Sequence, residues 1–262
     1  MRAGRIAEAF ARASSEHRAA LISYIMGGDP DPVLFLEYAR SIASVSDIIE
    51  IGIPFSDPIA DGPVIQAAST RALSRNTRVG AVVEACGEIS GIAPVVLMTY
   101  YNTVHRAGEK EFVSRMSAAG VSGLIVPDLP YEEGTSLRRE CARAGVDCIL
   151  LSSPSTKPER ARRIAELTSG FLYVVSRYGV TGARTEMTES LASMVSSYRA
   201  LSSKPVAVGF GISSPEQIRS ISQTGADGIV VGSAIVSLIG KGEDPSVVSA
   251  FVSKLRDASS SV

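Results

Sequence analysis

Short runs of apolar residues recur along the chain, and polar segments with a helical pattern separate them. Each run is nearly continuous and rich in β-branched residues, which is typical of strands buried on both faces of a parallel sheet. The pattern predicts eight strands: LISYIM (21–26), DIIEIGI (47–53), PVVLMTY (94–100), GLIVPDL (123–129), DCILLSS (147–153), FLYVVS (171–176), PVAVGFG (205–211) and GIVVGS (228–233).

Helix-boundary signals lie between these runs. The segment SPEQ at 214–217 supplies an N-cap serine, a proline in the first turn and an acid near the positive end of the helix. The segment STKPE at 155–159 opens another helix. Gly120, Gly145 and Gly225 each follow an alanine-rich stretch and precede a strand by a few residues, which indicates helix C-caps.

One further helix is predicted before the first strand. Ile6, Ala9, Phe10 and Ala13 fall on one helical face, so this helix is expected to pack on the domain. The same segment is rich in Arg and Ser, as transit peptides are, but it also contains two glutamates, which transit peptides avoid. We therefore favour the packed helix over a targeting segment.

Eight strand–helix units in 262 residues predict an α/β fold of the (β/α)₈ TIM-barrel class. The alternative is an open, doubly wound sheet, but no GxGxxG motif follows the first strand. Because no linker or change in composition divides the chain, we expect residues 1–262 to form a single barrel domain with the extra N-terminal helix.

Composition narrows the classes of function. With 26 basic and 27 acidic residues, the chain has no strong field to attract nucleic acid or an anionic membrane. No apolar run reaches the 18 or more residues of a membrane span. Cys86, Cys141 and Cys148 form neither a disulfide framework nor a zinc motif, so a reducing, cytoplasmic location is expected.

The first candidate for chemistry is a carboxyl group within a predicted strand. Glu50 lies in the apolar run IIEIG, where an acid without a partner is costly. Pairing with a structural Arg or Lys is one interpretation. The other is a carboxyl at the barrel mouth whose raised pKa lets it donate and accept protons. Asp57 and Asp61 follow on a loop rich in Pro and Gly, either as turn formers or, for Asp61 above all, as a second acid.

Glycines cluster after the last three predicted strands, at 179–182, 209–213 and 232–234. Glycine lets backbone N–H groups approach an anion, and the loops after strands 7 and 8 are the usual phosphate site of such barrels. We predict a phosphate site there; glycine-rich turns without a ligand are the alternative.

Aromatic side chains accompany these strand ends. Tyr24, Tyr100, Tyr101, Tyr173 and Phe210 either fill the barrel core or bind a flat, apolar substrate. By contrast, neither histidine has ligand-like spacing: His17 follows the first helix, and His105 is predicted in a polar loop. Lys204 precedes its strand and is expected at the far end of the barrel, so neither a metal site nor a Schiff-base lysine is predicted.

Taken together, these segments resemble the alpha chain of tryptophan synthase, from residue 5 to about residue 255. The most specific part is EIGIPFSDPIADGP at 50–63, followed by IQ at 65–66. The segments PDLP (127–130), SRYGVTG (176–182) and GFGIS (209–213) support the resemblance independently. Departures are few: the family more often has one glycine where Gly27 and Gly28 stand, and a small residue in place of Tyr178.

The resemblance implies a retro-aldol lyase that cleaves indole-3-glycerol phosphate to indole and glyceraldehyde 3-phosphate for tryptophan biosynthesis. Glu50 and Asp61 match its two catalytic carboxylates, and Tyr24 stands where the family often has Phe against the indole. Asp57 and the 181–184 stretch match mobile loops that communicate with a beta chain. The expected substrate contacts are Tyr24, Tyr100, Tyr173, Thr181, Gly182, Phe210, Gly211, Gly232 and Ser233.

The resemblance also implies partners and cofactors. The chain is expected to join a beta chain in an alpha2-beta2 heterotetramer and to pass indole to it. No metal and no cofactor are expected in this chain, because the pyridoxal phosphate of the complete synthase belongs to the beta chain. Two rivals remain: a related phosphate-binding barrel such as indole-glycerol-phosphate synthase or phosphoribosylanthranilate isomerase, and a noncatalytic subunit that only regulates the beta chain. The synthase requires a strand-end lysine, which we do not find.

Overall fold

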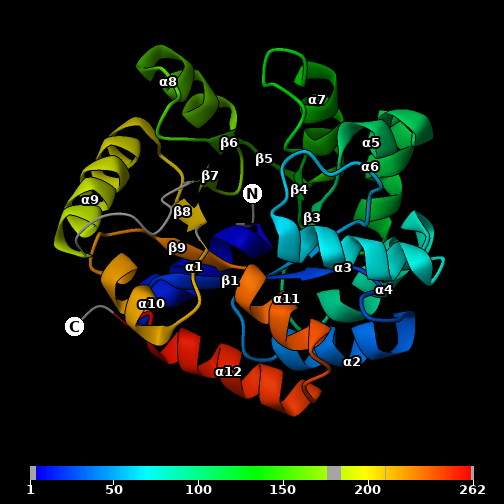
Figure 1. Cartoon of the computed structure of the whole chain (residues 1–262). Coiled ribbons are helices and arrows are strands. Elements are labelled where there is room, and N and C mark those ends of the chain that lie inside the picture. The colour runs from blue at the N-terminus through cyan, green and yellow to red at the C-terminus, as the bar shows by residue number, and fades with distance from the viewer. Residues whose placement is uncertain (1–3, 176–183, 210, 261–262) are drawn as a thin grey trace.

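The apolar runs form parallel strands that follow one another around a nearly closed barrel, with helices outside it (Figure 1). The computed structural model describes residues 4–175, 184–209 and 211–260, with the backbone alone for residues 184–190. The strands within these ranges are β1 (Ala20–Met26), β2 (Ile48–Gly52), β3 (Val95–Met98), β4 (Gly123–Ile125), β5 (Asp147–Ile149), β6 (Leu151–Ser152), β7 (Leu172–Val175), β8 (Val206–Gly209) and β9 (Gly228–Val231). Their order is β5-β4-β3-β2-β1-β9-β8-β7-β6.

Helices connect consecutive strands and form the outer ring. They are α1 (Arg5–Ser15), α2 (Pro32–Ala43), α3 (Pro63–Ser74), α4 (Val79–Ser90), α5 (Tyr101–Ala107), α6 (Glu109–Ala118), α7 (Thr135–Ala144), α8 (Pro158–Leu167), α9 (Arg184–Leu201), α10 (Pro215–Ser222), α11 (Ser233–Gly240) and α12 (Pro245–Asp257). The predicted TIM-barrel class and the extra N-terminal helix are both confirmed. None of the helices in the described part of the chain is long and apolar enough to cross a membrane.

Each of the eight predicted runs contains a strand, but the run 147–153 is divided into β5 and β6 at Leu150. The Leu150 N–H donates to the Thr168 hydroxyl at 3.0 Å instead of to a neighbouring strand, so the backbone ladder breaks for one residue. β5 pairs with β4 and β6 pairs with β7, so the two ends of the sheet lie one residue apart. The barrel therefore closes through an interrupted strand.

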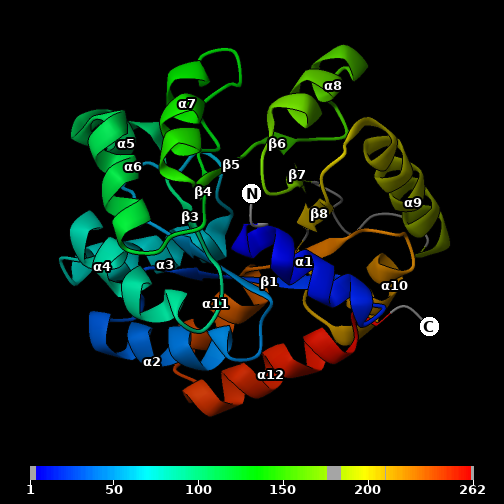
Figure 2. The same ribbon diagram turned by 180° about the vertical axis from the view of Figure 1, so that it is seen from behind.

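Alternating positions along the strands divide the core into two layers. Odd-numbered residues of β2, such as Ile49 and Ile51, pack against the helices, while Ile48 packs inside the barrel. Helix α1 lies across the amino-terminal end of the barrel (Figure 2), and its predicted apolar face is buried there against Phe171 and other inward residues. Because alternation continues, the inward face of β2 runs from Ile48 to Glu50 and then to Gly52, at the opposite end.

The helix-boundary signals are also confirmed. Ser214 and Gln217 form a capping box at the start of α10. Gly120, Gly145 and Gly225 all have positive φ after helices, which non-glycine residues rarely adopt. One expectation is wrong: His105 lies in α5 and not in a loop. The Tyr101 N–H at the start of α5 donates to the Asp128 carboxylate at 2.8 Å, a cap supplied by a distant segment that local sequence does not reveal.

Candidate active site

A cavity of about 460 Å³ opens at the carboxyl ends of the strands, where active sites of such barrels are built. Strands, the loop after β2 and the start of α11 all contribute to its wall. The lining residues are Tyr24, Glu50, Ile59, Ala60, Asp61, Gly62, Ile65, Met98, Ile125, Pro127, Leu151, Tyr173, Val175, Gly209, Gly211, Val230, Gly232 and Ser233. The fold thus brings most of the predicted site residues to one cavity.

Glu50 is a buried ionisable group on the inward face of β2. It lies between Tyr24 of β1 and Val96 of β3 in the strand register, and its side chain is 1% exposed. Its Oε2 atom has no hydrogen-bond partner among the described residues. Burial, and secondarily the nearby charge of Asp61, raise the pKa of Glu50 to about 8. Near pH 7 this carboxyl is therefore mostly protonated, and it is able both to give and to take a proton.

Among the described residues, no Arg, Lys or His forms an ion pair with the Glu50 carboxyl. The first interpretation drawn from the sequence, a glutamate neutralised by a structural Arg or Lys, is therefore not supported. Arg18 and Arg71 instead pair with Asp47 and Asp29, two other buried acids.

Asp61 lies on the loop between β2 and α3, and its side chain is half-buried at the cavity wall. The Tyr100 hydroxyl donates to Asp61 Oδ2 at 3.0 Å, and the Ala60 N–H donates to the same hydroxyl at 3.0 Å. Gln66 Nε2 donates to the Asp61 carbonyl at 2.8 Å. Burial raises the pKa of Asp61, and the Tyr100 hydrogen bond opposes this shift. Asp61 is thus held in place by side chains from β3–α5 and α3.

The loop that carries Asp61 is fixed at both ends and exposed between them. At its start, the Ser69 hydroxyl accepts from the Phe55 N–H and donates to the Phe55 carbonyl, both at 2.9 Å. The Phe55 ring stacks on Tyr100, with ring centroids 5.0 Å apart. The central residues are exposed: among the described residues, Asp57 accepts a side-chain hydrogen bond from its neighbour Ser56, and Ile59 is 78% exposed. The loop tip is therefore exposed in the described part of the chain.

Two tyrosines from different strands contribute to the cavity wall. Tyr24 of β1 and Tyr173 of β7 both line the cavity. In each case a glycine of the next strand makes room for the hydroxyl: Gly52 for Tyr24, and Gly209 for Tyr173, where a Cβ would lie 2.7 Å from Tyr173 Oη. Burial raises the pKa of both hydroxyls well above its ordinary value, so both remain protonated donors.

Glycines and a helix start form a further part of the cavity wall, next to the tyrosines. Gly232 is the N-cap of α11, and it has no side chain to accept from the first N–H groups of that helix. Ser233 follows it at the cavity wall. Around Gly211 a Cβ would find no atom within 4 Å, so the space over this backbone is open. These are properties of an anion site at a helix N-terminus. Thr181, Gly182 and Phe210, which were predicted here too, lie outside the described residues.

Several residues of the cavity escaped prediction. The apolar wall includes Ile65, Met98, Ile125 and Leu151, which read as ordinary core residues in the sequence. Inward alternation along the strands identifies Met98, Ile125 and Leu151 once the barrel is known, whereas Ile65 comes from the first turn of α3. Tyr100, which is predicted as a substrate contact, is not among the residues that line this cavity, and its hydroxyl donates to Asp61.

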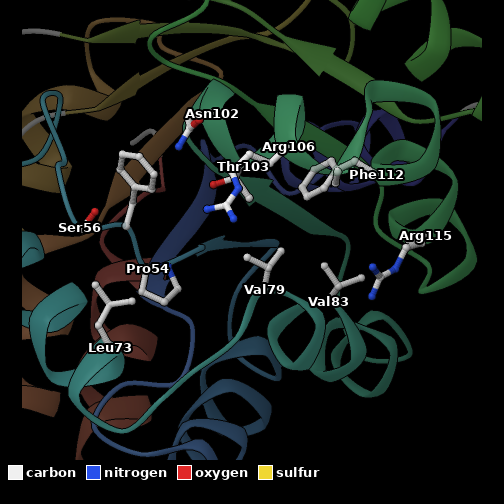
Figure 3. Close-up of a pocket in the computed structure, with 12 residues that line it drawn as sticks. Pro54, Ser56, Leu73, Val79, Val83, Asn102, Thr103, Arg106, Phe112 and Arg115 are labelled. Atoms are coloured by element: carbon white, nitrogen blue, oxygen red, sulfur yellow. The ribbon is translucent and has the colours of Figure 1, made fainter.

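A second cavity of about 480 Å³ lies beside the first, between the loop after β2 and helices α3 to α6. Figure 3 shows Arg106 reaching toward Val79, and Arg115 beside Val83. Its described lining residues include no carboxyl or imidazole group for proton transfer. Pro54, Phe55 and Ser56 at its edge belong to the same loop as Asp61. This loop therefore contributes residues to both cavities. Within the described ranges, no cluster of three or more His, Cys, Asp or Glu side chains forms a metal site.

Comparison with known proteins agrees with this geometry. The family model described as the tryptophan synthase alpha chain matches residues 10–259. The alpha chain of Gloeobacter violaceus is 47% identical over 239 residues, covering 90% of this chain and 87% of the relative. The alpha chain of Arabidopsis thaliana is 43% identical over 243 residues, covering 92% and 88%.

Solved structures give the same result. Tryptophan synthase of Mycobacterium tuberculosis matches with a TM-score of 0.91 and 36% identity, covering 99% of this chain and 100% of that chain. The alpha subunit of Legionella pneumophila str. Paris matches with a TM-score of 0.89 and 32% identity, covering 98% of both chains. With a family model over most of its length and relatives above 40% identity, this chain belongs to the tryptophan synthase alpha chain family.

Proposed function

We propose that Glu50 and Asp61 carry out the reaction of this chain at the cavity between β1, β2, β7 and α11. As a member of its family the chain is a carbon–carbon lyase of tryptophan biosynthesis, which cleaves indole-3-glycerol phosphate to indole and glyceraldehyde 3-phosphate. The observation that supports these two residues most is the buried carboxyl of Glu50, whose pKa is raised to about 8 and whose Oε2 atom has no hydrogen-bond partner among the described residues.

Cleavage requires two proton transfers on the substrate. Indole C3 must gain a proton, and the hydroxyl on the adjoining side-chain carbon must lose one as the carbon–carbon bond breaks and the aldehyde forms. A protonated Glu50 supplies the first proton, and the carboxylate that results accepts the second, so the residue returns to its starting state. A carboxyl with a pKa of about 8 suits both steps near neutral pH.

Asp61 has a complementary role in this proposal. Protonation at C3 places positive charge on the indole ring, whose N–H becomes a stronger donor. An ionised Asp61 beside that N–H stabilises the charge and orients the ring. The Tyr100 hydroxyl, which donates to Asp61 at 3.0 Å, favours the ionised form that this role requires.

The phosphate of the substrate is assigned to the glycine side of the cavity. Gly211, Gly232 and Ser233 offer backbone N–H groups and the positive end of α11. Thr181, Gly182 and Phe210 complete the proposed contacts, together with Tyr24 and Tyr173 along the wall. The apolar side chains of Ile65, Met98 and Ile125 suit the flat indole ring.

The chain pairs with a beta chain, as its family does. We propose an alpha2-beta2 heterotetramer in the cytoplasm, with Asp57 at the exposed loop tip facing the partner or the 181–184 stretch. Pyridoxal phosphate is assigned to the beta chain and no cofactor to this one. Residues 1–262 are proposed to form one domain.

The test is the rate of indole-3-glycerol phosphate cleavage with and without a beta chain. Glu50→Gln keeps the shape of the side chain but cannot transfer a proton, and Asp61→Asn keeps the shape but cannot carry the negative charge. The rate of cleavage should therefore fall by about 10²-fold or more in each variant. Glu84→Gln, on the exposed face of α4, is the matched control and should retain the rate. Substantial turnover by Glu50→Gln removes the proton-transfer role. No turnover by the unmutated chain, alone or with a beta chain, favours the noncatalytic alternative.

A further inference from the structure

The Tyr24 hydroxyl has no hydrogen-bond partner among the described residues. Its side chain is 6% exposed and lines the catalytic cavity. Burial, and secondarily the negative charges of Asp61 and Glu50, raise the pKa of this hydroxyl. Among the described residues, no hydrogen bond contributes to the shift. The hydroxyl is therefore a donor at the cavity wall that is not engaged by another described residue.

The position of this hydroxyl is set by two glycines. One side of Tyr24 packs on Gly232, where a Cβ would lie 3.3 Å from Tyr24 Cβ. At the other end, Tyr24 Oη occupies the space that a side chain of residue 52 would fill, because Gly52 has none. The hydroxyl therefore lies over β2, one inward position beyond Glu50 toward the mouth of the barrel.

Glu50 is within reach of that position. Tyr24 and Glu50 are register partners on adjacent strands, and Glu50 and Gly52 point to the same face of β2. Two residues of a strand span roughly 6.6 Å, and an extended glutamate side chain crosses more than half of that distance. Glu50 Oε2 also has no hydrogen-bond partner in the part of the chain that the structure describes. The Tyr24 hydroxyl and Glu50 Oε2 thus both lack a hydrogen-bond partner among the described residues, and they belong to neighbouring inward positions of the barrel.

We infer that Tyr24 is a positioning residue for Glu50: when the glutamate side chain turns toward the barrel mouth, the Tyr24 hydroxyl donates a hydrogen bond to its carboxylate. This inference rests on the proposed role of Glu50 as the proton-transfer group. The hydrogen bond is strongest after Glu50 has given its proton away, so it holds the carboxylate at the side of the cavity from which it must take the second proton.

Other groups face Glu50 and must be separated from this effect. Asp61 approaches from the loop after β2 and, through its charge, opposes ionisation of Glu50. Tyr173 approaches from β7, and its hydroxyl is directed to Gly209. Tyr100 acts on Asp61 and not on Glu50 directly. Tyr24 is therefore the donor whose removal is expected to act on the Glu50 carboxylate without disturbing the Asp61 contact.

The experiment is a titration of the Glu50 carboxyl carbon by ¹³C NMR in the full chain and in Tyr24→Phe, assigned through Glu50→Gln. Loss of a donor to the carboxylate should raise the Glu50 pKa by about one to two units. The limb of the pH–rate profile that disappears in Glu50→Gln should move upward by the same amount. Tyr38→Phe removes a buried hydroxyl that donates to the Glu243 carbonyl, outside the barrel, and should leave the titration unchanged.

A superimposable or downward-shifted titration in Tyr24→Phe overturns the inference. A higher KM for substrate with an unmoved titration overturns it too, because it assigns the hydroxyl to the substrate instead. Gly52→Ala provides a second variant: the added Cβ displaces the Tyr24 hydroxyl, and the titration should shift in the same direction. If Glu50→Gln retains turnover, the proposed role of Glu50 fails, but the titration still decides whether Tyr24 and Glu50 interact.

Discussion

Replacement of Glu50 by Gln should stabilise the chain increasingly as the pH rises. In the folded chain the pKa of Glu50 is about 8, against 4.5 for an ordinary glutamate. Below pH 4.5 both the folded and the unfolded chain keep the proton on this carboxyl, so its ionisation does not change the free energy of unfolding. Between the two values only the unfolded chain ionises, and the free energy of unfolding falls by about 1.4 kcal/mol per pH unit.

The size of the effect follows from this slope. Glutamine does not titrate, so the stability advantage of Glu50→Gln should grow by about 3 kcal/mol between pH 5 and pH 7. Above about pH 8 both forms of the chain are ionised at this position, and the advantage should level off. An increment of this size exceeds the usual effect of a surface substitution, which lies within about 0.5 kcal/mol.

Urea denaturation of the isolated chain at pH 5, 6, 7 and 8 measures this difference, provided that the m-values of both proteins agree. Glu84→Gln on the exposed face of α4 makes the same chemical change without the burial, and its effect should stay constant across the series. A Glu50→Gln advantage that does not change with pH would show that Glu50 is not held as a neutral acid. Glu50 would then lack the raised pKa on which its proposed proton-transfer role depends.

Two further predictions concern the phosphate side and the loop. A Cβ at Gly211 meets open space, so Gly211→Val should fold normally yet weaken binding of indole-3-glycerol phosphate at least about tenfold through lost N–H contacts; equal weakening of indole binding, measured by calorimetry, would point to a collapsed cavity instead. Asp57→Ala should reduce the stimulation by a beta chain more than it reduces the rate of the isolated chain, because Asp57 is exposed at the loop tip; equal losses in both assays would place Asp57 in the alpha-chain reaction itself.

Much of the barrel follows from local signals in the sequence. Continuous apolar runs predict buried parallel strands, and capping residues such as Ser214 and Gly145 mark where helices start and stop. The two differences arise from contacts between distant segments. The Thr168 hydroxyl interrupts the strand at Leu150, and the Asp128 carboxylate starts helix α5 at Tyr101. Neither contact leaves a pattern within the segment that it changes.

The same distinction applies to the site. Glu50 is recognisable because an acid in an apolar strand is unusual whatever surrounds it. Its partners are not recognisable in this way. The Tyr100 contact to Asp61 joins residues 39 positions apart, and the open space around Gly211 depends on several strand ends at once. Sequence reasoning therefore finds the group with the unusual burial, while the geometry that tunes it requires the closed barrel.

Tyr100 shows what this tertiary geometry adds to the mechanism. On the side of the catalytic cavity, its hydroxyl donates to Asp61 and accepts from the Ala60 N–H. Its ring stacks on Phe55, at the edge of the second cavity. Displacement of Phe55 therefore disturbs the ring whose hydroxyl stabilises the ionised form of Asp61. Because the exposed tip of the loop lies between these two anchored ends, we expect that contact with the tip would affect Asp61 through both of them. The position of the Asp61 carboxylate thus depends on the whole loop, whereas strand β2 fixes the backbone of Glu50.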